Sequence, residues 1–151
     1  MGLLKWAGFS KQPNLFEKIR VKTEQKESYT PNWLEWASKN CEQATASGTQ
    51  AGLGWTTIYT IPKDKIFFLT NIAITGSGGG TSEVATIIGG NIYLHLIRLN
   101  CLSNVTSANA INFNMPIKIS DNVDIELGVA GTGTFSVNIA GFLIPISAEK
   151  V

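Results

Sequence analysis

Residues 51–151 are a succession of short segments in which apolar and polar residues alternate. Between residues 122 and 129, aliphatic side chains occupy every odd position, and polar residues or glycine occupy every even one. A period of two residues is typical of a β-strand with one buried face. Eight strands are predicted in this way, over 55–61, 65–75, 83–88, 91–99, 110–115, 117–120, 122–129 and 134–144. The fold class is therefore expected to be all-β, an eight-stranded antiparallel sandwich with jelly-roll topology.

One predicted strand, 65–75, is apolar on both faces. In a regular strand, one face would carry Ile66, Phe68, Ile72 and Ile74, and the other Phe67, Leu69 and Ala73. A strand of a sandwich has only one side that faces the core. The second face, with Phe67 and Leu69, is therefore expected to contact another copy of the chain. A closed symmetric oligomer would bury that face in every copy.

The first third of the chain has a different character, because it holds about half of all the charged residues. One helix is predicted there, over about 31–45, with Thr30 as its N-cap and Pro31 at its first position. The apolar residues of this region are too few to form a core. We therefore expect two parts, an extended N-terminal attachment arm over 1–50 with one short α-helix, and a jelly-roll domain over 51–151.

Aromatic residues gather in the predicted arm, which contains three of the four tryptophans. Aromatic side chains are favoured anchors at protein–protein contacts, because they bury a large area at a low cost in entropy. Sugar-binding platforms also use tryptophan, but these usually lie on a folded face. The residues expected to attach the arm to a partner are Trp6, Phe16, Trp33 and Trp36.

The charge and hydropathy of the chain argue against two classes of partner. A formal net charge of +1 gives no electrostatic reason to expect binding to nucleic acid or to an anionic membrane. No apolar run approaches the roughly 18 residues that a membrane span needs. Lys5 interrupts the N-terminus before the apolar core of a signal peptide could form, so the chain is expected to be cytosolic when made.

The residues that could carry chemistry are few. Cys41 and Cys101 are the only cysteines and are expected to be buried free thiols. His95 is the only histidine, so a multi-histidine metal site is excluded. It could act as a base for a cysteine, but no third, orienting group is indicated. We expect His95 on a sheet face or at a subunit interface, and we expect no catalytic residue, metal or cofactor.

Two further motifs have simpler explanations than a ligand site. Asp121, Asp124 and Glu126 could suggest acid–base chemistry or calcium, but two of them alternate along a strand on its predicted solvent face. The glycine-rich stretch 76–80 is not followed by the Gly-Lys-Ser/Thr of a phosphate loop. It is expected to be a loop tip between strands.

Four segments taken together resemble a family of viral proteins: 59–70, 112–119, 123–127 and 141–145. They are similar to the small jelly-roll structural proteins of tailed phages and related viruses, which include head fibres, decoration proteins and spike-like modules. In that group a strand ending in Ile-Pro, a charged turn and an aromatic strand begin the barrel, and a Gly-Phe strand closes it. The resemblance covers 55–145. The group shares no active site, so no functional residue is carried over from it.

This resemblance implies a non-enzymatic virion protein, made in the cytoplasm of a host. It implies a homotrimer of jelly rolls held to a capsid or tail protein by N-terminal arms. From the residues themselves, the expected oligomer interface contains Phe67, Leu69 and His95. The alternative is a receptor- or carbohydrate-binding module whose exposed barrel loops bind a host receptor or glycan. The two are compatible if the barrel is the tip of a fibre. A third possibility, a hydrolase or isomerase of the cupin type, would need a histidine-rich metal set, whereas this chain has one histidine.

Overall fold

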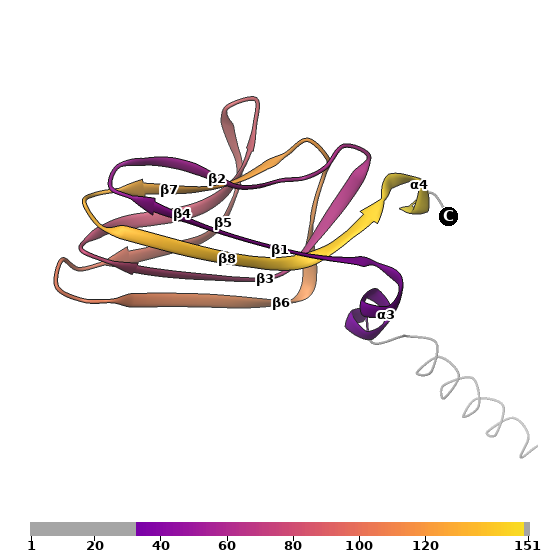
Figure 1. The fold of residues 1–151 in the computed structure, drawn as a ribbon, viewed down its shortest axis with the longest axis horizontal. Coiled ribbons are helices and arrows are strands. Elements are labelled where there is room, and N and C mark those ends of the chain that lie inside the picture. The colour runs from indigo at the N-terminus through magenta and orange to yellow at the C-terminus, as the bar shows by residue number, and fades with distance from the viewer. Residues whose placement is uncertain (1–32, 150–151) are drawn as a thin grey trace, which may run out of the picture. The chain divides into compact units, whose positions relative to one another are not determined.

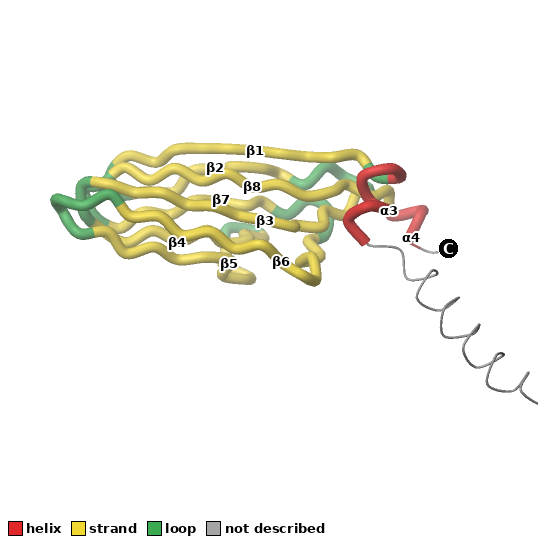
Figure 2. The backbone as a smooth tube through the Cα atoms, turned by 90° about the horizontal axis from the view of Figure 1, so that it is seen from below, coloured by secondary structure: helices red, strands yellow, loops and turns green. Residues whose placement is uncertain are grey.

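The structure, a computed structural model, describes residues 33–149, and its main feature is a pair of four-stranded antiparallel sheets (Figures 1 and 2). The strands are β1 (Glu42–Ala51), β2 (Gly54–Thr60), β3 (Lys65–Ser77), β4 (Gly80–Ile88), β5 (Asn91–Cys101), β6 (Ser107–Ile119), β7 (Asp124–Ala130) and β8 (Thr134–Pro145). Sheet A has the order β1-β8-β3-β6, and sheet B has the order β2-β7-β4-β5.

Two short helices flank the strands in the sequence, α3 (Trp33–Asn40) and α4 (Ile146–Glu149). The chain divides into two units, Met1–Asn40 and Cys41–Val151, and the strands found between residues 33 and 149 all belong to the second. Neither helix is long and apolar enough to cross a membrane, and no other is found between residues 33 and 149.

The strand pairing is nested: β1 pairs with β8, β2 with β7, β3 with β6, and β4 with β5. The chain thus resembles one long hairpin that turns at β4–β5. It then folds over, so that β8 also pairs with β3 and β7 also pairs with β4. This order is consistent with the predicted jelly-roll sandwich. The predicted all-β class, with eight antiparallel strands in two sheets, is confirmed.

The number of strands agrees with the prediction, but two positions differ. β6 is one strand where two were predicted, and β1 was not predicted at all. Residues 42–45 lie in β1, so the C-terminal part of the predicted helix over 31–45 is wrong. The second compact unit also begins at Cys41, whereas the sequence placed the domain boundary at residue 51.

β1 was not predicted because the side chains that it turns toward the core are small. Ala44, Ala46 and Gly48 face inward, and the two alanines pack against the core. Alanine favours helices and gives a weak alternation of hydropathy. Gly48 lies against Ile58, and a Cβ there would displace only the Cδ1 at the tip of that side chain.

Pro116 lies in β6, an edge strand of sheet A, as the predicted bend or edge requires. The pairing of β6 with β3 passes from Ile117 opposite Leu69 to Asn112 opposite Asn71. The residues between Ile117 and Asn112 therefore bulge out of the ladder.

A β-bulge at Thr70 decides which side chains of β3 reach the core. Leu69 pairs with Gly141 and Asn71 with Ala140 on β8, which leaves Thr70 as an extra residue. One extra residue reverses the alternation of the side chains beyond it.

As a result, four apolar side chains from both ends of β3 lie on the same, inner face: Phe67, Leu69, Ile72 and Ile74, none more than 1% exposed. Phe67 and Leu69, expected at an intersubunit contact, are instead fully buried in the chain's own core. The sequence indicates a second apolar face only if the strand is regular, and the bulge at Thr70 makes it irregular.

We predict that Gly141→Ala destabilises the fold, because Gly141 makes room for this bulge. A Cβ at Gly141 would overlap the carbonyl oxygen of Phe68 and lie 2.7 Å from two ring atoms of Phe67. The expected loss is about 1–3 kcal/mol in the free energy of unfolding, measured by guanidinium denaturation. Gly48→Ala is the matched control, because there the obstacle is the mobile tip of Ile58. Equal losses in the two variants would contradict this role of the bulge.

The stability of the domain is also expected to fall at alkaline pH through Tyr59. Its ring packs 5.5 Å from that of Phe67, and burial, followed by the nearby Glu42, raises the pKa of Tyr59, while Lys65 lowers it. Below the ordinary pKa of 10.0 the stabilisation is fully present. Above pH 10 the tyrosine hydroxyl ionises in the unfolded chain before it does so in the folded one. The free energy of unfolding therefore falls with rising pH until Tyr59 of the folded chain is ionised as well. Urea denaturation at pH values from 8 to 11 should show that the free energy of unfolding falls less steeply in Tyr59→Phe than in the wild type. Parallel pH curves for the two proteins would refute this role of Tyr59.

Candidate functional site

One row of residues crosses the whole outer face of sheet B. The register places Trp55 of β2 opposite Gly128 of β7, Gly128 opposite Glu83 of β4, and Glu83 opposite Arg98 of β5. Each of the four strands thus contributes one residue to one line. Alternation along the strands turns these side chains away from the core. Trp55 is 46% exposed, which is unusual for so large an apolar side chain.

The indole of Trp55 lies flat on the sheet, over Gly128. A Cβ at Gly128 would lie 2.7 Å from each of three indole atoms, Cε2, Cζ2 and Cη2. Equal distances to three ring atoms mean that the ring presents its face, not its edge, to the strand. Glycine therefore lets one face of the indole rest on β7, while the exposed remainder of the ring is open to solvent.

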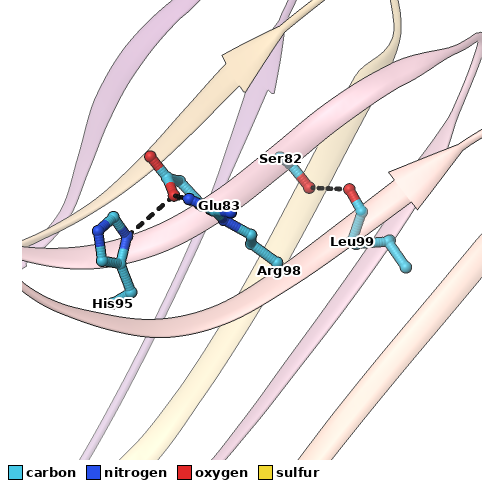
Figure 3. A network of polar contacts seen from close by, with 5 residues as sticks. All are labelled: Ser82, Glu83, His95, Arg98 and Leu99. Carbon is cyan, nitrogen blue, oxygen red and sulfur yellow. Dashed lines mark hydrogen bonds and ion pairs between the residues drawn. The ribbon is translucent and has the colours of Figure 1, made fainter.

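Beside the indole, Glu83 holds a compact network of polar contacts (Figure 3). Its Oε2 accepts hydrogen bonds from Arg98 Nε at 3.1 Å and pairs with Arg98 Nη2 at 3.0 Å. The same oxygen lies 2.9 Å from His95 Nδ1, which donates when it carries the proton. The Glu83 side chain is 19% exposed, compared with 52% for His95 and 66% for Arg98. The carboxylate is thus held in place by two more exposed partners.

The neighbouring residue on β4 shows that the two sides of the strand differ. Ser82 is 1% exposed, and its hydroxyl donates to the carbonyl oxygen of Leu99 at 3.4 Å (Figure 3). Ser82 therefore anchors the buried side of the β4–β5 pair, and Glu83 and Arg98 remain on the outer side.

A shallow cavity of about 360 Å³ lies along this row. Its lining includes Leu53, Trp55, Thr81, Glu83, Arg98 and Ala130. It combines one large aromatic surface with a fixed carboxylate and a guanidinium. A concave, partly apolar surface with a few convergent polar groups is the usual form of a small-molecule site.

The structure places the residues singled out in the sequence in different surroundings. His95 lies on the exposed face of sheet B, and its role at an interface stays a prediction. Trp33 begins α3, and Trp36 of the same helix is 44% exposed. Trp6 and Phe16 lie outside the described residues. The attachment role of these aromatic residues also stays a prediction.

The acidic residues near β7 have local partners. Thr60 donates to Asp124 Oδ1 at 2.5 Å, and Thr57 donates to Glu126 Oε1 at 3.3 Å, both across the β2–β7 pair. Asp121 Oδ2 accepts from the backbone N–H of Asp64 at 3.2 Å. These contacts link strands and turns. Over residues 33–149, no three His, Cys, Asp or Glu side chains come together as a metal site would require.

The two thiols are unpaired with each other and differ in burial. Cys101 is 5% exposed, and its Sγ lies 2.8 Å from the carbonyl oxygen of Val105. Cys41 is only partly buried, and burial raises the pKa of its thiol. The expected burial is therefore confirmed for Cys101 and only partly so for Cys41.

Comparison with known proteins gives remote structural likenesses only. No protein-family model and no curated protein matches the sequence. A capsid structure of the Helicobacter pylori bacteriophage KHP30 is 11% identical, with a TM-score of 0.41, over 68% of this chain and 90% of that one.

Two further structures are similar at the same level. A virus-like particle of the extra small virus of the prawn Macrobrachium rosenbergii has 9% identity and a TM-score of 0.38, over 68% of this chain and 79% of that one. RmlC from Streptococcus suis, solved with dTDP-D-xylose, has 10% identity and a TM-score of 0.32, over 78% of this chain and 52% of that one. Likenesses this weak carry no argument about function.

We predict that Gly128→Ala lifts the indole of Trp55 off the sheet, because a Cβ cannot fit beneath the ring. In protein labelled with 5-fluorotryptophan, one of the four fluorine resonances should move, namely the one missing from Trp55→Phe. Gly48→Ala on sheet A is the control and should leave that resonance in place. An unchanged Trp55 resonance in Gly128→Ala would contradict the flat placement of the ring.

Proposed function

We propose that this chain is a non-enzymatic structural component of a virion that assembles with copies of itself through its jelly-roll domain. The residues before β1 would attach it to a capsid or tail protein. The similarity of residues 55–145 to small viral jelly-roll proteins supports this proposal, as does the nested order of the strands. The observation that carries it is the exposed apolar surface of the β4–β5 hairpin.

The end of this hairpin exposes four large apolar side chains. β4 and β5 are joined by Gly89 and Gly90, both with positive φ, as a tight two-residue hairpin turn requires. The first five residues of β5 are all exposed. The exposed apolar residues are Ile88 at 47%, Ile92 at 43%, Tyr93 at 77% and Leu94 at 40%. A group of this kind on a soluble protein usually marks a contact with a partner.

A hollow lies next to these side chains. Its volume is about 290 Å³, and the hairpin residues Ile88, Tyr93 and Leu94 line it. The rest of the lining includes Lys118, Ile119, Ser120 and Val123. Thr86 also lines it, and within residues 33–149 the buried hydroxyl of Thr86 has no hydrogen-bond partner. The hairpin thus offers both a projecting ring, Tyr93, and a cavity that could receive one. A surface with both parts can pair with copies of itself in a closed ring.

Charge favours a second copy as the occupant. Residues 84–94 contain no charged side chain, so identical hairpins would meet without like-charge repulsion between them. Lys118 is the one charged residue that lines the hollow. β5 is also an edge strand of sheet B. Edge strands that remain single are usually protected by lysine, proline or a bulge, because their unpaired backbone groups invite pairing. Residues 91–94 contain neither lysine nor proline, but β5 bulges at Tyr93, between Ile92 opposite Ile87 and Leu94 opposite Thr86. The contact would therefore be made by the exposed side chains and not by a strand added to this edge.

We predict that Tyr93→Asp converts the oligomer to a monomer, because it would bury a charge in the apolar contact. The mass is measured by light scattering after size exclusion, and the homotrimer implied by the family resemblance is the expected starting state. Met115→Asp is the control, because Met115 is 85% exposed on β6 and away from the hairpin residues in sequence. A monomeric wild type, or a Tyr93→Asp variant of unchanged mass, would refute assembly through this hairpin.

A further inference from the structure

We propose that the outer face of sheet B binds a neutral saccharide, with Trp55 stacking on the sugar ring and Glu83 and Arg98 binding its hydroxyl groups. This site uses none of the hairpin residues assigned to self-assembly. It therefore goes beyond the structural role proposed above and does not depend on it.

The indole supplies a flat apolar platform. One face of the Trp55 ring rests on Gly128, and the residue remains 46% exposed. The face of an aromatic ring is electron-rich. One side of a pyranose ring presents several C–H groups, which are apolar and slightly positive, so the two flat surfaces are complementary. In the described part of the chain, no acceptor pairs with the indole N–H, which leaves it available to a hydroxyl.

The polar groups beside the platform match hydroxyls, which both donate and accept hydrogen bonds. All the contacts of Glu83 engage Oε2, and no donor from residues 33–149 pairs with Oε1. Arg98 uses its Nε and Nη2 on Glu83, so the other N–H groups of the guanidinium are available. An acceptor and several donors are thus fixed side by side. Because the ion pair already orders both side chains, a ligand meets less entropic cost on binding.

The spacing of the row suits a single sugar ring. The indole covers Gly128, and Glu83 stands on the adjacent strand, about 4.8 Å away in the direction of strand pairing. A ring stacked on the indole would therefore hold its hydroxyls beside the carboxylate. The cavity, about 360 Å³, falls near the lower end of the range of about 300–1,000 Å³ usual for ligand sites.

The charges on this face favour a neutral ligand. Glu126 and Asp124 alternate with Gly128 along β7, so they lie on this face and would repel a phosphate, sulfate or carboxylate. Arg98 already neutralises Glu83 and would repel a cation approaching the indole. A ligand with hydroxyl groups, an apolar face and no charge avoids both penalties.

The test uses the full chain on an array of neutral, sialylated and sulfated oligosaccharides, followed by calorimetric titration with the neutral oligosaccharide bound best. We expect binding to neutral oligosaccharides. Trp55→Ala should weaken the titrated affinity at least tenfold, and Arg98→Ala should weaken it severalfold. Arg98 is 66% exposed, so this second variant should fold even if the first does not.

Trp36→Ala is the matched control, since Trp36 is 44% exposed and lies in α3. It should bind as the wild type does. Absence of binding to every neutral oligosaccharide, binding to charged ones alone, or an affinity unchanged in a folded Trp55→Ala or in Arg98→Ala would overturn the proposal. Light scattering on the same samples reports assembly separately. Loss of saccharide binding with an unchanged oligomer mass would leave the structural role standing.

Discussion

The core of the sandwich depends on one irregularity, the bulge where β3 passes β8. Thr70 is the extra residue, and its hydroxyl donates to the carbonyl oxygen of Ala140 at 3.0 Å. Because the bulge resets the alternation of side chains, β3 contributes apolar residues to the core along nearly its whole length. Without it, either Phe67 and Leu69 or Ile72 and Ile74 would face away from the core. Gly141 opposite the bulge makes the irregularity possible, since any side chain there would strike the β3 backbone.

The sequence was sufficient for the fold wherever apolar side chains alternate regularly. β7 and β8 lie within a residue or two of the predicted segments, and the edge position of β6 follows from Pro116. β1 could not be predicted in this way, because alanine and glycine at its inward positions give almost no hydropathy signal. The bulge was equally hidden, since a strand with one extra residue reads, in sequence, as a strand with two apolar faces. Both differences arise from packing between strands, which no local pattern records.

The outer face of sheet B was less predictable than the fold. The sequence predicts a sheet-face position for His95, but it assigns no role to Trp55, the one tryptophan outside the predicted arm. Glu83 and Arg98 carry no recognisable motif, and they are 15 residues apart along the chain. Only the register of four strands brings them into one row with Trp55. The sequence does contain one trace of this row, a glycine at 128 within an otherwise side-chain-rich strand, because glycine inside a strand often marks a close approach.

The nested pairing also has a consequence for the order in which the molecule can form. Glu42 pairs with Leu143, at opposite ends of the domain sequence, whereas β4 and β5 meet across a two-residue turn. Contacts distant in sequence form slowly, because a long loop must close first. Among the described strands, β1 leaves the ribosome first, yet the strand to which it is hydrogen-bonded, β8, emerges last. Sheet A is therefore completed last, when β8 pairs with both β1 and β3.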